Sequence, residues 1–194
     1  MTTSAQPPVA ARTMSDFVDL AGLGDEAKGA LAPTHGPKQY VQTLFDQKLY
    51  PDAVRFLAHA LPKREGIWWA WVCARRAAAE APAPNDAAAL DATERWITQP
   101  TDDNRRAAMR AAEAVGLATP AGCTALAAFL SGGSLGPANT PPVPPGELLT
   151  AKAITGAVVA SAVSGDAAKA PERFQSFIAQ GLDVVNRLKL WGDA

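Results

Sequence analysis

The chain has 194 residues, enough for one ordinary domain and too few for two comfortable ones. Its 18 basic and 19 acidic residues give a net charge of −1, which argues against binding nucleic acid or an anionic membrane by bulk charge. Hydrophobic residues make up 48% of the chain, aromatic residues only 7%, and alanine is abundant. This composition predicts an all-α fold with a packed core.

We interpret residues 1–13, which are mostly Thr, Ser, Ala and Pro, as a disordered leader, and residues 14–194 as a single helical domain. No signal peptide and no apolar run long enough to cross a bilayer is recognised. We therefore expect no membrane insertion and a cytoplasmic location. Cys73 and Cys123 lie in apolar stretches without metal-ligand spacing, so we expect small buried thiols in a reducing compartment and no metal or cofactor.

Apolar residues recur at helical spacing along most of the chain, and prolines or glycines separate the runs. Thr101 is expected to cap a helix that Gly116 ends. Connections this short favour antiparallel neighbours, so the predicted architecture is a compact bundle of helical hairpins, or alternatively a solenoid-like stack. The expected helices are residues 15–23 (after a Ser15–Asp16 cap), 37–49, 51–61, 67–80, 85–97 (after an Asn85–Asp86 cap), 101–115, 120–130, 148–163 and 171–191.

Residues 131–146 (SGGSLGPANTPPVPPG) are too rich in proline for a helix or a central strand. We expect them to run extended, partly as polyproline II, between two helical parts. Leu135 and Val143 are the sizeable apolar side chains of this loop, and we expect them to attach it to the body. A phosphate-binding loop is not favoured, because no strand precedes the glycines and no Lys-Ser/Thr pair follows them.

Three of the five tryptophans, Trp68, Trp69 and Trp71, lie within four positions. With their apolar neighbours they cover about two-thirds of a helix circumference, which predicts a central and mostly buried helix. The alternative is that one indole stays exposed as an interface anchor. Arg75 and Arg76 follow two turns after Trp68 and Trp69, so their stems are expected to pack on the aromatic arc.

Those two arginines are expected to form a structural ion pair with a neighbouring helix, or alternatively to anchor an acidic partner. His59 lies on an apolar helix and is expected to be hydrogen-bonded and largely buried rather than a catalytic base. A further charged pattern is typical of a solvated helix face with intrahelical pairs. It consists of Asp102, Asp103, Arg105, Arg106, Arg110 and Glu113.

Several phrases occur together in this chain: residues 50–65 (YPDAVRFLAHALPKRE) running into residues 68–70 (WWA), then 104–108 (NRRAA), 119–122 (TPAG), 128–135 (AFLSGGSL), 141–145 (PPVPP) and 149–153 (LTAKA). In these phrases, over about residues 35–165, the chain resembles an uncharacterised bacterial family known only as a domain of unknown function. That family is loosely associated with type VI secretion loci and their adaptor or effector-loading genes. The resemblance implies an adaptor or chaperone role and supplies no catalytic residues.

The sequence therefore favours a non-catalytic helical adaptor or chaperone that binds another protein, such as a secretion component or an effector, and no nucleic acid. The alternative is a small-ligand-binding protein or enzyme with a pocket near Trp68, Trp69, His59 and Arg75. The candidate partner contacts are Lys63, Arg64, Glu65, Trp68, Trp69, Arg75, Pro141, Pro142, Val143, Pro144 and Pro145.

Overall fold

The structure, a computed structural model, describes residues 13–78, 82–137 and 139–192. The leader predicted for residues 1–13 lies outside these residues except for Thr13. The Thr13 side chain accepts a hydrogen bond from the backbone N–H of Asp16, and the Asp16 carboxylate accepts one in return from the Thr13 N–H. This capping box places the start of the first helix slightly before the predicted Ser15–Asp16 cap.

Every regular element in the described residues is a helix, which confirms the predicted all-α fold. No helix in these residues is long and apolar enough to span a membrane. In chain order the helices are α1 (Met14–Ala21), α2 (Asp25–Gly29), α3 (Pro37–Asp46), α4 (Tyr50–Ala60), α5 (Lys63–Ala77), α6 (Pro84–Thr98), α7 (Asp102–Val115), α8 (Pro120–Phe129), α9 (Leu149–Val163), the short 3-10 helix η2 (Ala167–Lys169) and α10 (Ala170–Arg187).

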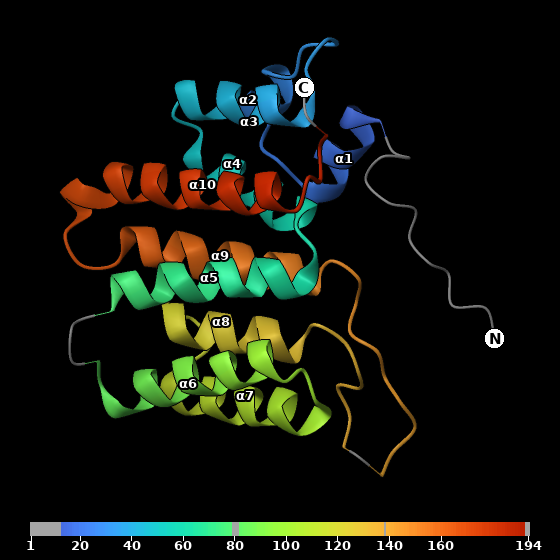
Figure 1. Cartoon of the computed structure of the whole chain (residues 1–194), viewed down its shortest axis with the longest axis vertical. Helices are drawn as coiled ribbons and strands as arrows, with labels where there is room; N and C mark the ends of the chain where they lie inside the picture. The colour runs from blue at the N-terminus through green and yellow to red at the C-terminus, as the bar shows by residue number, and fades with distance from the viewer. Residues whose placement is uncertain (1–12, 79–81, 138, 193–194) are drawn as a thin grey trace.

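The helices from α5 to α10 are stacked with roughly parallel axes, and α1 to α4 lie at the other end of the stack from α6 and α7 (Figure 1). Helix α9 is central, because it packs against α4, α5, α8 and α10. Helix α8 joins this centre to α6 and α7. The arrangement is compact and is built from neighbouring antiparallel helices, as the short connections predict.

One helix was missed, and several predicted boundaries need correction; among them, α5 begins at Lys63, four residues before the predicted start, and α3 ends at Asp46, three residues before the predicted end. Helix α2 was not predicted, because a five-residue helix is too short to show a hydrophobic period. Helix α6 begins at Pro84 without a side-chain cap, since the Asn85 amide donates instead to the Ala114 carbonyl oxygen at 3.0 Å. Helix α10 ends at Arg187, before Trp191, and Lys189 just beyond it adopts a left-handed conformation with φ of 50°.

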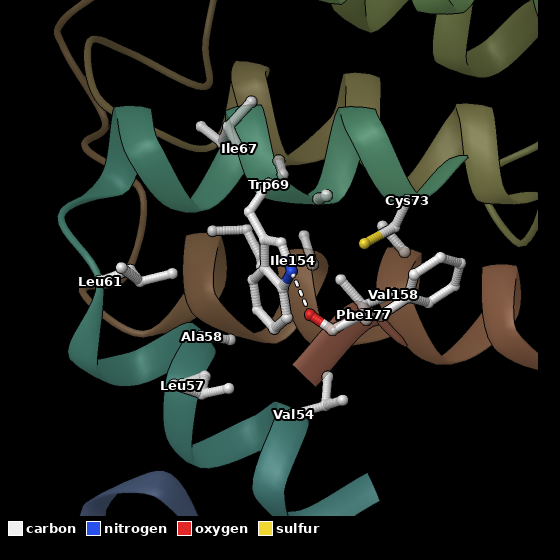
Figure 2. Packing of buried hydrophobic residues seen from close by; sticks show 14 of the residues in the cluster. Val54, Leu57, Ala58, Leu61, Ile67, Trp69, Cys73, Ile154, Val158 and Phe177 are labelled. Atoms are coloured by element: carbon white, nitrogen blue, oxygen red, sulfur yellow. Dashed lines mark hydrogen bonds between the residues drawn. The ribbon is translucent and has the colours of Figure 1, made fainter. Parts of the chain in front are cut away.

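The tryptophan-rich helix α5 crosses the core, as its wide apolar arc predicts. Trp69 is fully buried, and its Nε1–H donates to the Phe177 carbonyl oxygen of α10 at 2.9 Å (Figure 2). Trp68 and Trp71 are half-buried, and Trp71 donates to the Leu90 carbonyl oxygen of α6 at 3.0 Å. The indoles therefore connect α5 to helices on two sides.

Candidate functional site

The proline-rich loop, residues 131–146, connects α8 to α9 and has no helix or strand among its described positions, as predicted. In Figure 1 it leaves one end of α8, runs past α6 and α7 and returns to the start of α9. Its two arms are bonded to each other: the Leu135 N–H donates to the Val143 carbonyl oxygen at 2.8 Å. The Ser134 hydroxyl oxygen accepts from the N–H groups of Gly136 and Val143, at 3.1 and 3.0 Å. These bonds join residues 134–136 to Val143, and we call this paired part the neck of the loop.

Three charged residues in the first turns of α7 hold this loop, and we call them the arginine clamp: Asp102, Arg105 and Arg106. Arg105 donates to the carbonyl oxygens of Phe129 and Ser134, at 2.8 and 2.9 Å. Arg106 donates to the Gly136 carbonyl oxygen at 3.0 Å. Asp102 accepts from both arginines, at 2.8 and 2.6 Å from Arg105 and at 2.7 Å from Arg106. The clamp thus joins α7 to the end of α8 and to the neck of the loop.

Arg105 is only 4% exposed, and its guanidinium lies over the Phe129 ring with 4.7 Å to the ring centroid. A buried guanidinium is costly unless its charge and its N–H groups are satisfied, and here Asp102 and the two carbonyl oxygens satisfy them. Hydrogen bonds from Arg106 and then Arg105 hold the pKa of Asp102 below its ordinary value. The clamp is therefore a charge-balanced unit that uses the loop backbone as part of its hydrogen-bond set.

Gly133 lies directly against the guanidinium of Arg105. It has a left-handed φ of 66°, and a Cβ at this position would lie 2.8 Å from Arg105 Nε. Both the conformation and the space therefore require glycine. This contact accounts structurally for part of the Ser-Gly-Gly-Ser sequence that begins the loop.

Two predictions about this region are wrong. Arg105 belongs to a buried contact and not to a solvated helix face, because carbonyl oxygens distant in sequence accept its N–H groups. Leu135 and Val143 do not attach the loop to the body, since they are 38% and 54% exposed. The loop is attached through its backbone carbonyl oxygens, which bind the arginine clamp.

The predicted contact turn at Lys63, Arg64 and Glu65 is the first turn of α5, and Lys63 reaches the start of the loop. Lys63 Nζ donates to the Ser131 carbonyl oxygen at 3.0 Å, and Arg64 Nε donates to the Ile97 carbonyl oxygen at 2.8 Å. Glu65 is half-buried. The structure therefore brings Lys63 to the first residue of the loop, but both cations already bind their own chain.

The structure places the candidate tryptophans and the two nearby arginines in different surroundings. Trp69 has no exposed surface and is not available to a partner, whereas Trp68 is half-buried in a hollow of about 470 Å³ between α5 and α10. Arg75 lies over Trp71, 5.5 Å from its ring centroid, rather than over Trp68. Arg76 donates to the Ser176 hydroxyl at 3.2 Å. The ion pair that was predicted for these arginines is not found among the described residues.

The alternative pocket near Trp68, Trp69, His59 and Arg75 does not form as one site. His59 lines a different hollow, between α1, α4 and α9, and its Nδ1 bonds to the Arg55 carbonyl oxygen at 2.8 Å. No group of three potential metal-ligating side chains occurs in the part of the chain that the structure describes.

The two cysteines differ in burial. Cys73 is buried in the core, as predicted, but Cys123 is only half-buried. Its thiol donates to the Leu117 carbonyl oxygen at 3.0 Å. Burial raises the pKa of both thiols. Neither site favours the thiolate form that a nucleophile needs.

Asp102, Arg106 and above all Arg105 were not among the predicted site residues. The i, i+3 and i, i+4 spacing of Asp102 to the two arginines did indicate their pairing. Nothing local indicated that the arginines also bind the loop, because the Phe129 and Ser134 carbonyl oxygens lie 24 and 29 positions away.

A family model described as "Family of unknown function (DUF6931)" matches residues 40–185. The match begins within α3, ends within α10 and includes the arginine clamp and the whole proline-rich loop. No curated protein and no solved structure matches the chain. The resemblance to a domain of unknown function is confirmed at the level of the family, and this chain belongs to the family of unknown function DUF6931.

Proposed function

We propose that this chain is a non-catalytic adaptor or chaperone-like protein that binds another protein through the proline-rich loop. The observation that carries the proposal is the arginine clamp, which fixes the loop backbone while the loop side chains stay exposed. Pro141, Pro142, Val143 and Pro144 are all exposed, and Pro145 is half-buried. A segment held in one path loses less conformational entropy on binding than a free segment does.

The partner that fits this surface is a protein with a groove lined by aromatic side chains. Such grooves bind extended proline-rich segments, whose restricted backbone lowers the entropic cost of binding. The loop offers two overlapping P-x-x-P spacings, Pro141 to Pro144 and Pro142 to Pro145. Val143, 54% exposed, adds an apolar side chain between them.

The bonds of three other candidate residues support the non-catalytic proposal. Lys63 and Arg64, two of the candidate partner contacts, and His59, from the alternative pocket, each bond to a backbone carbonyl oxygen of the chain itself, as structural residues do. We extend the proposal to a cytoplasmic location, because both Cys73 and Cys123 are free thiols, which suit a reducing compartment. The resemblance stated above favours bacterial type VI secretion as the setting, with a secretion component or an effector as the partner.

The test replaces residues 141–145 by a Gly/Ser linker of equal length. Proteins that co-purify with the wild-type chain are identified by mass spectrometry, and each is then purified and titrated against both forms. We expect the variant to keep its helical circular dichroism and to bind the partner at least about tenfold more weakly, since both apolar contacts and preorganisation are lost.

The matched control is Pro33→Gly combined with Thr34→Ser, which makes the same kind of change at exposed residues of another loop. This control is expected to bind as the wild type does. Equal binding by the 141–145 variant would remove the loop from the interface. A loss of helicity in that variant would show that the loop is a structural strap and not a binding segment.

A further inference from the structure

A hollow of about 550 Å³ lies between the end of α1, one face of α4 and one face of α9. Its volume falls within the range of small-molecule sites. Part of its wall is apolar, at Leu20 and Val159 among others, and part carries the basic side chains of Arg55, His59 and Lys152. No aspartate or glutamate is among the described residues that line it.

Arg55 is held in place and still has free donors. Its Nη1 donates to the Gly22 carbonyl oxygen at 2.9 Å and to Asp52 Oδ1 at 3.2 Å. Its Nε and Nη2 have no acceptor among the described residues, and together they form the edge that binds a carboxylate through two parallel hydrogen bonds.

Lys152 supplies a second positive charge, from α9. It is exposed, lies in the first turn of α9, and has no carboxylate within 4.0 Å among the described residues. Asp52 balances Arg55, but nothing described balances Lys152. The hollow therefore has a net positive rim beside an apolar wall.

His59 lines the same hollow as these two charges. Its Nδ1 bonds to the Arg55 carbonyl oxygen, so Nδ1 carries the proton in the neutral ring and Nε2 is an acceptor. That Nε2 is shielded from solvent and has no partner among the described residues. Burial lowers the pKa of His59, and the positive charges of Arg55 and Lys152 act in the same direction, against the bond to the Arg55 carbonyl. The charges of Arg55 and Lys152 thus both influence the pKa of the His59 imidazole.

We propose that this hollow binds a small amphipathic anion, a monocarboxylate with a short apolar chain. The carboxylate lies between the free edge of Arg55 and the ammonium of Lys152, and the chain covers Leu20 and Val159. The site is separate from the proline-rich loop and does not depend on the proposed adaptor function.

The structure offers a specific reporter for this proposal, because the chain has two histidines, His35 and His59. Octanoate is the probe, and the imidazole Cε1 protons are followed by NMR in the full chain, with the signals assigned from His35→Gln. A bound carboxylate offsets the repulsion from Arg55 and Lys152, while α1 contributes no charged group to the lining. We expect octanoate to shift the His59 signal saturably and to raise the pKa of His59. The His35 signal is expected to stay where it is.

Lys152→Glu is the decisive variant, and it suits the fold because a carboxylate in the first turn of α9 interacts favourably with the helix dipole. We expect it to weaken octanoate binding by at least about tenfold. Lys169→Glu, an equal charge change at an exposed residue outside the lining, is expected to bind as the wild type does. Acetate, which has no apolar chain, is expected to bind much more weakly than octanoate.

Three results would overturn the proposal. The first is no movement of the His59 signal at millimolar octanoate. The second is equal octanoate affinity in Lys152→Glu and the wild type. The third is acetate binding as strong as that of octanoate, which would reduce the hollow to a nonspecific anion contact.

Discussion

Gly181 of α10 lies directly against the indole of Trp69. A Cβ at Gly181 would be 3.0 Å from two indole carbons and 3.2 Å from the Cδ1 atom of Leu57. The carbonyl group that accepts the Trp69 N–H belongs to Phe177, one turn earlier in α10. The missing side chain and the hydrogen bond therefore serve the same close approach of α5 to α10; Figure 2 draws the hydrogen bond between Trp69 and Phe177.

Trp69→Ala is expected to lower the free energy of unfolding by about 3–5 kcal/mol, as truncation of a large core side chain does. Urea denaturation followed by circular dichroism measures this change. Trp68→Ala is the control: the same truncation on a half-buried indole is expected to cost clearly less. A loss below about 1 kcal/mol for Trp69→Ala would show that the indole is at the surface.

Gly181→Ala is expected to lower the free energy of unfolding by on the order of 1 kcal/mol, because overpacking against the indole outweighs the helix propensity of alanine. Gly156→Ala is the matched helical control, since its Cβ would meet only the Cys123 Sγ at an ordinary 3.5 Å. That control is expected to be neutral or stabilising. Equal effects of the two substitutions in the same denaturation experiment would contradict the close approach at Gly181.

Features with local signals could be predicted from the sequence. Thr101 caps α7 by accepting from the Asn104 N–H, within one turn, and Gly116 ends that helix, as expected. The burial of Trp69 followed from the apolar arc of its own helix. The proline content of residues 131–146 was sufficient to exclude regular structure.

Contacts between distant residues could not be predicted in the same way. Arg105 belongs to a short-range pattern of charges that is typical of a solvated surface, and the tertiary fold overrides that pattern by placing carbonyl oxygens of α8 and the loop beside it. The same holds for Lys63 and Ser131, which are 68 positions apart. The position of the loop therefore depends on packing, although its lack of regular structure is encoded locally.

The two thiols are expected to react at different stages with Ellman's reagent. Burial raises the pKa of both, so neither should react rapidly near neutral pH. Cys123 is half-buried and should react slowly in the native protein, whereas Cys73 should react only after unfolding. Cys123→Ala should remove the native reaction, and Cys73→Ala should leave it unchanged. Rapid alkylation of Cys123 at neutral pH would instead indicate an activated nucleophile.

Arg105→Met is expected to release the loop and to lower the free energy of unfolding by about 1–3 kcal/mol, because buried carbonyl oxygens lose their donors. Hydrogen exchange of the Leu135 and Val143 amides, which bond within the neck of the loop, should accelerate. Arg105→Lys should not restore their protection, since a single ammonium cannot replace the fork that reaches Asp102, Phe129 and Ser134. Unchanged exchange of these two amides in Arg105→Met would show that the neck holds without Arg105.

The arginine clamp should weaken in acid because of Asp102. Hydrogen bonds from Arg106 and then Arg105 lower the pKa of this carboxyl from its ordinary value of 3.8. A carboxyl whose pKa is lower in the folded chain contributes stability that is fully present above the unfolded value and is lost as the pH falls through the folded value. The free energies of unfolding of the wild type and of Asp102→Asn should therefore differ by a constant amount near neutral pH, and the difference should shrink below about pH 4.

Asp102 is 54% exposed, so added salt should reduce this difference at every pH. Asp103→Asn, at the next exposed position, is the control for the loss of one negative charge in the first turn of α7. A difference between the wild type and Asp102→Asn that stays constant into acid would show that the carboxylate does not support the clamp.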